Sequence, residues 1–167
     1  MEKVLYSEKE KFIAFTGHRI IPLVRQEEVR ARLTAAVTLA CKLGMTRFYC
    51  GMALGFDMMA AEVVLSLKDK FSDIQLIAVV PFSRQSSRWA SSEQERYYRI
   101  LAKTDKVVTL SENYFRGCLL KRNDYMLSHS CGVIAYFDGK PQGGTFYTVR
   151  KAERMKMDVV NIYGKRG

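Results

Sequence analysis

The sequence predicts one α/β domain built on an open, mostly parallel sheet of about six strands with helices on both faces. Three observations predict it: short apolar runs recur along the chain, segments with helical spacing separate them, and glycine-containing turns follow several of the runs. The 167 residues, 48% of them hydrophobic, suffice for one buried core and are too few for two domains. This alternation of strand and helix is Rossmann-like.

The apolar runs are typical of buried parallel strands. They occupy residues 12–16, 47–50, 74–80, 106–110, 133–137 and 159–163. The first helix has Val29, Leu33 and Val37 on one face and Gly44 as its stop. The second, around Met58, is apolar nearly all round, which predicts burial. The last three helices are expected at residues 93–103, 119–128 and 145–155.

Composition limits the environment and the partners. Residues 1–10 form a charged, polar tail before a single domain at residues 11–167, and no apolar stretch is long enough to cross a bilayer. We therefore expect a cytoplasmic protein with no membrane partner. The net charge of +10 favours an anionic partner. Four widely spaced cysteines and two histidines form no metal-binding pattern, so no metal site is expected.

The first glycine turn follows the second predicted strand and opens the second helix. Its sequence is Gly51-Met52-Ala53-Leu54-Gly55-Phe56-Asp57. Glycine permits close approach of the backbone to a ligand, and a helix start offers free N–H groups and a positive dipole end. We predict ligand contacts from Gly51, Met52, Ala53, Gly55 and Asp57. Asp57 either caps backbone N–H groups or serves a ribose hydroxyl or a leaving group.

The second glycine turn, Gly143-Gly144-Thr145, follows the fifth predicted strand and places Thr145 at or next to the N-cap of the last helix. It is either an ordinary capped helix start or a phosphate cradle. Asp138, at the end of the same strand, could bind a sugar hydroxyl or act as acid or base. Asp-Gly is also a plain turn signal.

The tip of the first strand carries a third polar group, Thr16-Gly17-His18-Arg19. Arg19 could form a bidentate contact with a phosphate, and His18 could donate a hydrogen bond, shuttle a proton or simply lie on the surface. In open parallel sheets, ligands bind beyond the carboxyl ends of the strands. All three turns fall on that edge, so we expect them to converge on one cleft.

A basic and aromatic stretch lies between the third and fourth strands. It contains Arg84, Arg88, Trp89, Arg96, Tyr97, Tyr98 and Arg99. Such a mixture suits a surface that stacks bases and neutralises phosphates, although Tyr97 could equally belong to the core face of a helix. Phe82 or Trp89 could cover a base, and Arg116 belongs to a second polar cluster with Arg122 and Asn123.

These motifs in this order resemble the SLOG superfamily, and the chain looks closest to its YpsA family. The resemblance covers nearly everything after residue 10 and includes Tyr114-Phe115-Arg116. It implies a nucleotide-derived ligand related to NAD or ADP-ribose, and the wider family's habits imply a homodimer. The LOG enzymes of this superfamily carry a catalytic Glu soon after their second glycine turn. Here no acid follows Thr145 until Glu153, which departs from the hydrolase pattern.

Three functions remain open from the sequence. The leading hypothesis is binding of NAD, ADP-ribose or a nucleoside phosphate, without chemistry. The enzyme alternative is hydrolysis of a glycosidic or phosphate ester bond with Asp57 or Asp138 as acid or base. The third is binding of single-stranded nucleic acid through the stretch at residues 84–99. The resemblance implies this function as well, because the SLOG superfamily contains the DNA-processing protein DprA, which binds single-stranded DNA.

Overall fold

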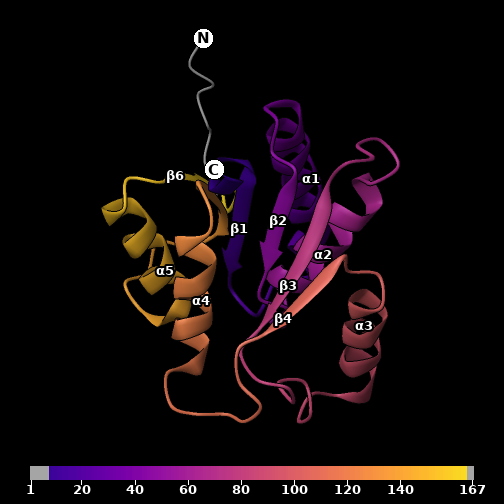
Figure 1. The fold of residues 1–167 in the computed structure, drawn as a ribbon, viewed down its shortest axis with the longest axis vertical. Coiled ribbons are helices and arrows are strands. Elements are labelled where there is room, and N and C mark those ends of the chain that lie inside the picture. The colour runs from indigo at the N-terminus through magenta and orange to yellow at the C-terminus, as the bar shows by residue number, and fades with distance from the viewer. Residues whose placement is uncertain (1–7, 165–167) are drawn as a thin grey trace.

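A computed structural model describes residues 8–164 and shows a six-stranded, fully parallel sheet in the order β4-β3-β2-β1-β5-β6 (Figure 1). The strands are β1 (Phe12–Gly17), β2 (Arg47–Cys50), β3 (Gln75–Val80), β4 (Lys106–Thr109), β5 (Gly132–Tyr136) and β6 (Asp158–Asn161). The predicted fold class is confirmed. In the described part, no helix is long and apolar enough to pass through a membrane.

Five α-helices cover the two faces of the sheet (Figure 1). They are α1 (Gln26–Lys42), α2 (Phe56–Leu67), α3 (Ser91–Leu101), α4 (Cys118–Ser128) and α5 (Gly143–Arg154). Helices α1 to α3 lie on one face, with α2 packed between the other two, and α4 and α5 pack together on the other. The position of α2 explains why its sequence is apolar on nearly every side.

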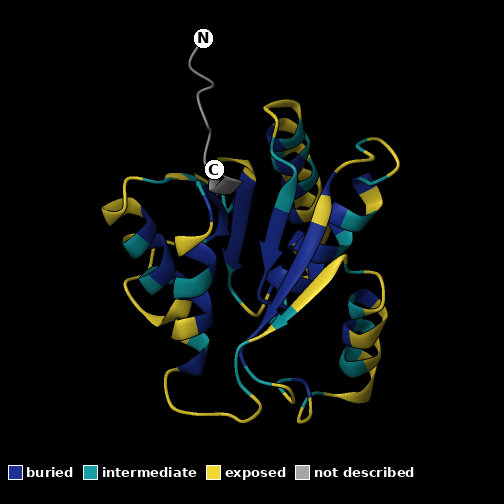
Figure 2. Cartoon of the chain, in the orientation of Figure 1, coloured by how far each residue is buried: buried dark blue, intermediate teal, exposed yellow. Residues whose placement is uncertain are grey.

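The core is divided by the sheet into two layers (Figure 2). In β1, Phe15 belongs to the layer under α1 and α2, whereas its neighbour Ala14 belongs to the layer under α4 and α5. Phe48 and Tyr49 divide in the same way in β2. Side chains alternate across a strand, so apolar residues at successive positions require cover on both faces. The five buried residues of β5 meet the same requirement.

Several details differ from the sequence predictions. The strands β4 and β6 are mostly exposed rather than buried, because each lies at an edge of the sheet with one neighbour. Helix α5 begins two residues earlier than expected, so Gln142 takes the N-cap position and Thr145 lies inside the first turn. Within the predicted tail, residues 8–10 belong to a short 3-10 helix, Glu8–Lys11, and residues 1–7 lie outside the described part.

The order of the strands places a switch point next to β1. From β1 the chain builds β2, β3 and β4 toward one edge, then crosses to β5 and β6 on the other side. The loops after β1 and β5 therefore leave the sheet toward opposite faces and open a crevice at its carboxyl edge.

Candidate functional site

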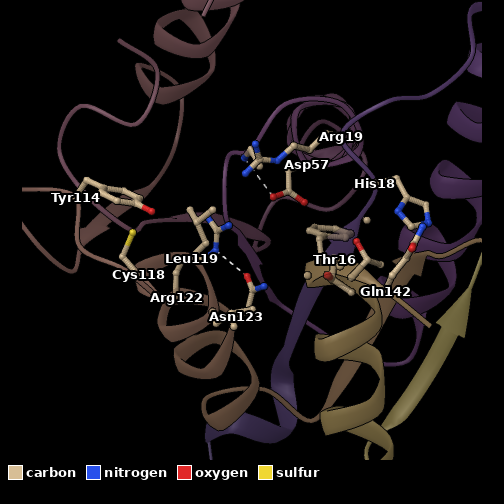
Figure 3. A pocket seen from close by; sticks show the side chains of 18 residues that line it. Thr16, His18, Arg19, Asp57, Tyr114, Cys118, Leu119, Arg122, Asn123 and Gln142 are labelled. Carbon is tan, nitrogen blue, oxygen red and sulfur yellow. Dashed lines mark hydrogen bonds between the residues drawn. The ribbon is translucent and has the colours of Figure 1, made fainter. Parts of the chain in front are cut away.

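A cleft of about 450 Å³ occupies this switch point (Figure 3). Its walls are the end of β1, the turn before α2 and the first turns of α4 and α5. Arg122 and Asn123 reach it from α4, Asp57 from α2 and His18 from the end of β1 (Figure 3). Four segments that are distant in sequence thus meet at one cavity.

The structure brings most of the predicted site residues to this cleft. Those that line it are Thr16, Gly17, His18, Arg19, Ala53, Asp57, Gly143, Gly144 and Thr145. Those that do not are Gly51, Met52, Gly55, Phe82, Trp89, Arg116 and Asp138. All three predicted turns contribute to the cleft, but the first glycine turn does so through Ala53 and Asp57 rather than through its glycines.

The glycines of the first turn are required by packing. A Cβ on Gly51 would lie 2.5 Å from Nη1 of Arg122, and a Cβ on Gly55 would overlap the backbone carbonyl of Arg19. Gly55 also has a φ of 79°, in the region that favours glycine. Gly17 is similar, since its Cβ would meet the ring of Phe56. Close packing within the protein explains these three glycines.

Asp57 is a buried carboxyl group in the wall of the cleft. Its Oδ2 accepts a hydrogen bond of 3.2 Å from the backbone N–H of Ala53, so it caps the turn that precedes α2. Burial raises the pKa of Asp57 to about 6, against the opposing influence of Arg122, the Ala53 N–H and Arg19. The carboxyl group therefore changes its protonation state closer to neutral pH than an ordinary aspartate does.

Arg122 is the main cation inside the cleft, and only 4% of its surface is exposed. Its Nη1 donates to the carbonyl of Gly51 at 2.5 Å, and its Nε donates to Oδ1 of Asn123 at 2.8 Å. Burial lowers the pKa of Arg122, which Asp57 partly offsets, but a guanidinium stays charged in proteins. These two bonds fix the guanidinium and leave its Nη2 donors for a ligand.

From the sequence, Arg122 belongs to a polar cluster that either reaches the ligand edge or only covers the surface, and it was not among the predicted ligand-binding residues, although a signal was present. Arg122 lies four residues after Cys118 and four before Met126, and both of those are buried. Residues at this spacing share one helical face. An arginine on an otherwise apolar face is seldom placed there without a partner or a ligand.

The second glycine turn is open where the first is filled. Apart from its chain neighbours and its own helix, no atom of residues 8–164 lies within 4 Å of the position that a Cβ would take on Gly144. In the same described part, the side chain of Gln142, the N-cap residue, makes no capping hydrogen bond. The first N–H groups of α5 therefore face the cleft free of a side-chain cap.

His18 and Asp138 form a pair at the rim of the cleft. Nε2 of His18 lies 2.9 Å from the backbone nitrogen of Asp138, whose N–H it accepts in the Nδ1–H tautomer, and 3.2 Å from Oδ1 of Asp138. The same Oδ1 accepts the N–H of Lys140, which lowers the pKa of Asp138. Asp138 thus lies behind His18 and orients its ring, while the histidine itself lines the cleft.

Three members of the basic and aromatic stretch pack or pair within the fold. Tyr97 is a core residue of α3, and Trp89 packs edge-on against it at 5.3 Å between ring centroids. Arg96 forms ion pairs with Glu62 and Glu93. The other aromatic candidate for covering a base, Phe82, contacts Tyr114, which does line the cleft. Arg116 is exposed outside it.

Comparison with solved structures shows proteins of similar fold. A solved structure of DNA processing protein A from Helicobacter pylori, which binds single-stranded DNA, superposes with a TM-score of 0.62 at 20% identity. The superposition covers 90% of this chain and 64% of that one, and at this identity it shows the fold alone.

Sequence relatives are described mainly by family membership. A UPF0398 protein of Bacillus pumilus is 26% identical over 86% of this chain and 82% of its own length. The UPF0398 protein YpsA of Bacillus subtilis is 26% identical over 66% of this chain and 63% of its own. Alignments with several further relatives span only 55% to 65% of those proteins. A family model described as the YspA SLOG family matches residues 13–163, and the chain therefore belongs to this YpsA family of SLOG proteins.

Proposed function

We propose that the protein binds a nucleotide-derived ligand, such as NAD, ADP-ribose or a nucleoside phosphate, in the cleft at the switch point. The observation that carries this proposal is the meeting of a buried guanidinium, Arg122, with the uncapped first turn of α5 in one cavity. Both features favour an anion, and a fixed guanidinium matches the geometry of a phosphate. The protein would act by binding, as a sensor does.

The polar groups suggest how such a ligand would lie. Its phosphate would contact the backbone of Gly143 and Gly144 and the free donors of Arg122, with Arg19 at the rim. The second oxygen of Asp57 has no hydrogen bond to the described residues and would accept one from a ribose hydroxyl. Tyr114 would offer a ring to the base. Each contact uses a side chain or amide that lines the cleft.

The proposal is tested by isothermal titration with NAD, ADP-ribose, AMP and cyclic AMP. In the variant Gly144→Asp, a carboxylate would stand where the phosphate is expected and would abolish binding by charge repulsion. Ser92→Asp is the matched control, because it places the same group in the first turn of α3, outside the cleft. Absence of binding to every probe, or equal binding by Gly144→Asp, would overturn the proposal.

Hydrolysis of a glycosidic or phosphate ester bond is a second candidate, and the state of Asp57 favours it. A carboxyl group with a pKa of about 6 in a ligand cleft is suited to donate or accept a proton near neutral pH. Asp138 is less suited, because it lies behind His18 with its pKa lowered. Release of free base or phosphate from a nucleotide, abolished in Asp57→Asn with binding retained, is the expected sign of this activity.

Nucleic-acid binding through residues 84–99 has less support from the geometry. Tyr97 and Trp89 pack together within the fold, and Arg96 is paired with acids. The exposed members that remain are Tyr98, Arg84, Arg88 and Arg99, so the stretch offers one exposed ring for stacking bases. An oligonucleotide affinity that falls steeply with salt would favour this third function over the cleft.

A further inference from the structure

A second hollow lies beside the cleft, between the loops that follow β3 and β4. It measures about 510 Å³, and the residues that matter here are Phe82, Arg84, Gln85, Arg88, Glu112 and Tyr114. We call it the loop hollow. The two loops lie side by side at the carboxyl edge of the sheet, where the N–H of Ser83 donates to the carbonyl of Ser111 at 3.2 Å (Figure 1).

The cleft and the loop hollow share their dividing wall. Tyr114 lines both cavities, and it stands at one end of the cleft in Figure 3. The carbonyl of Gly51 accepts hydrogen bonds from Arg122, in the cleft, and from Nε2 of Gln85, in the loop hollow, at 2.5 and 3.2 Å. The two cavities therefore adjoin at Tyr114.

The side chains of the loop hollow suit a base and a phosphate. The rings of Phe82 and Tyr114 meet edge to face at 5.5 Å, and Tyr114 is 65% exposed, so its ring has surface free for stacking. Arg84 and Arg88 are exposed, and no carboxylate of residues 8–164 forms an ion pair with either. Glu112 is the acid in this hollow, against two guanidinium groups.

We propose that the loop hollow is a second nucleotide subsite, and that the ligand of this protein is a dinucleotide. One phosphate-bearing unit occupies the cleft, at Arg122 and the start of α5. The second unit stacks its base on Phe82, or on the side of Tyr114 that lines the loop hollow, and places an anionic group near Arg84 and Arg88. Each cavity has its own cations, so the geometry fits a ligand with two phosphates better than a ligand with one. This inference rests on the proposed function of the cleft.

The experiment compares one-unit and two-unit probes by isothermal titration at fixed salt. The probes are AMP, the phosphodiester-linked dinucleotide pApA and the pyrophosphate-linked dinucleotide NAD. At least one dinucleotide is expected to bind about tenfold more tightly than AMP, since a stacked base contributes about 1–3 kcal/mol. Whichever dinucleotide gains identifies the linkage.

A charge-matched pair of double variants locates the second subsite. Arg84→Ser with Arg88→Ser is expected to remove the gain of the dinucleotide and leave AMP binding unchanged. Arg99→Ser with Lys103→Ser removes the same charge from exposed positions outside both cavities and is expected to keep the gain.

Each contrary result has a distinct meaning. Binding of AMP with no gain for either dinucleotide overturns the second subsite and leaves the proposed function standing. Equal losses in both double variants overturn it too, because bulk charge would then explain the gain. A ten-nucleotide strand that binds far more tightly than pApA contradicts a site closed at two units. No binding by any probe overturns the proposed function itself.

Discussion

The two glycine turns look alike in sequence and differ in what surrounds them. In the first turn, Gly51 is pressed against the guanidinium of Arg122 and Gly55 against the backbone of Arg19. In the second turn, Gly144 faces open space. The first turn therefore needs its glycines for close packing, whereas the second leaves open space at the start of a helix, where an anion is favoured.

This difference separates two uses of the same residue type. A glycine between a strand and a helix permits close approach, but the approaching group can be the protein's own. The first turn still serves the cleft, because its tight packing holds Arg122 and Asp57 in place. It acts as the support of the site, whereas the second turn offers the contact surface.

The largest effect is expected from Gly55→Ala. The new methyl group would overlap a backbone carbonyl, which cannot rotate away, and alanine disfavours a φ of 79°. We expect a loss of more than about 3 kcal/mol in the free energy of unfolding, measured by urea denaturation. The control is Gly117→Ala, which has a φ of 87° but no described atom within 4 Å of its Cβ. It should lose about 1 kcal/mol. Equal losses would show that packing at Gly55 is unimportant.

Asp57→Asn tests whether the first turn holds a charge at the expense of stability. The pKa of Asp57 in the folded protein is about 6, above the ordinary value of 3.8 for an aspartate. The folded state therefore binds this proton more tightly, and ionisation destabilises the fold as pH rises from about 4 to above 6. The neutral amide keeps an acceptor for Ala53, so Asp57→Asn should raise the free energy of unfolding at pH 8 by up to about 3 kcal/mol. At pH 4 it should change little.

Asp138→Asn provides a control of opposite sign. The N–H of Lys140 lowers the pKa of Asp138, so its carboxylate stabilises the fold above its unfolded pKa and loses this effect as pH falls through the folded value. The variant should be less stable than the parent at pH 8 and equal to it in strong acid. Urea denaturation at several pH values measures both variants. A change of the same sign in the stability of both variants at pH 8 would contradict the opposite pKa shifts of Asp57 and Asp138.

The sheet was predictable because its strands carry their own signal. The continuous apolar run of β1, buried on both faces, locates its strand within one residue, and the helical spacing of Val29 and Leu33 identifies the buried face of α1. The exposure of β4 was not predictable in this way. The sequence of a strand shows how apolar it is but not how many strands pair with it. Only the order of the strands in the sheet places β4 at an edge.

The cleft was predictable in outline, since the carboxyl ends of parallel strands share an edge. The chemical groups inside the cleft were less predictable. The role of Arg122 depends on its contact with Gly51, which is 71 residues away in the sequence. The packing of Trp89 against Tyr97 is also fixed only in the tertiary structure. Likewise, Asp138 reaches the cleft only through His18. The spacing of residues along the sequence does not predict any of these long-range contacts.

The smallest effect, and the clearest contrast with Gly55, is expected from Gly144→Ala. Gly144 lies in the first turn of α5 without a positive φ and with open space at its Cβ. Alanine loses less backbone entropy on folding, so the free energy of unfolding should rise by about 0.5 kcal/mol, or stay unchanged. The same variant adds a methyl group where a phosphate is expected, so nucleotide affinity should fall while stability does not. Calorimetric titration with AMP beside urea denaturation measures both. A loss of stability comparable to that of Gly55→Ala would show that the second turn, like the first, owes its glycines to packing.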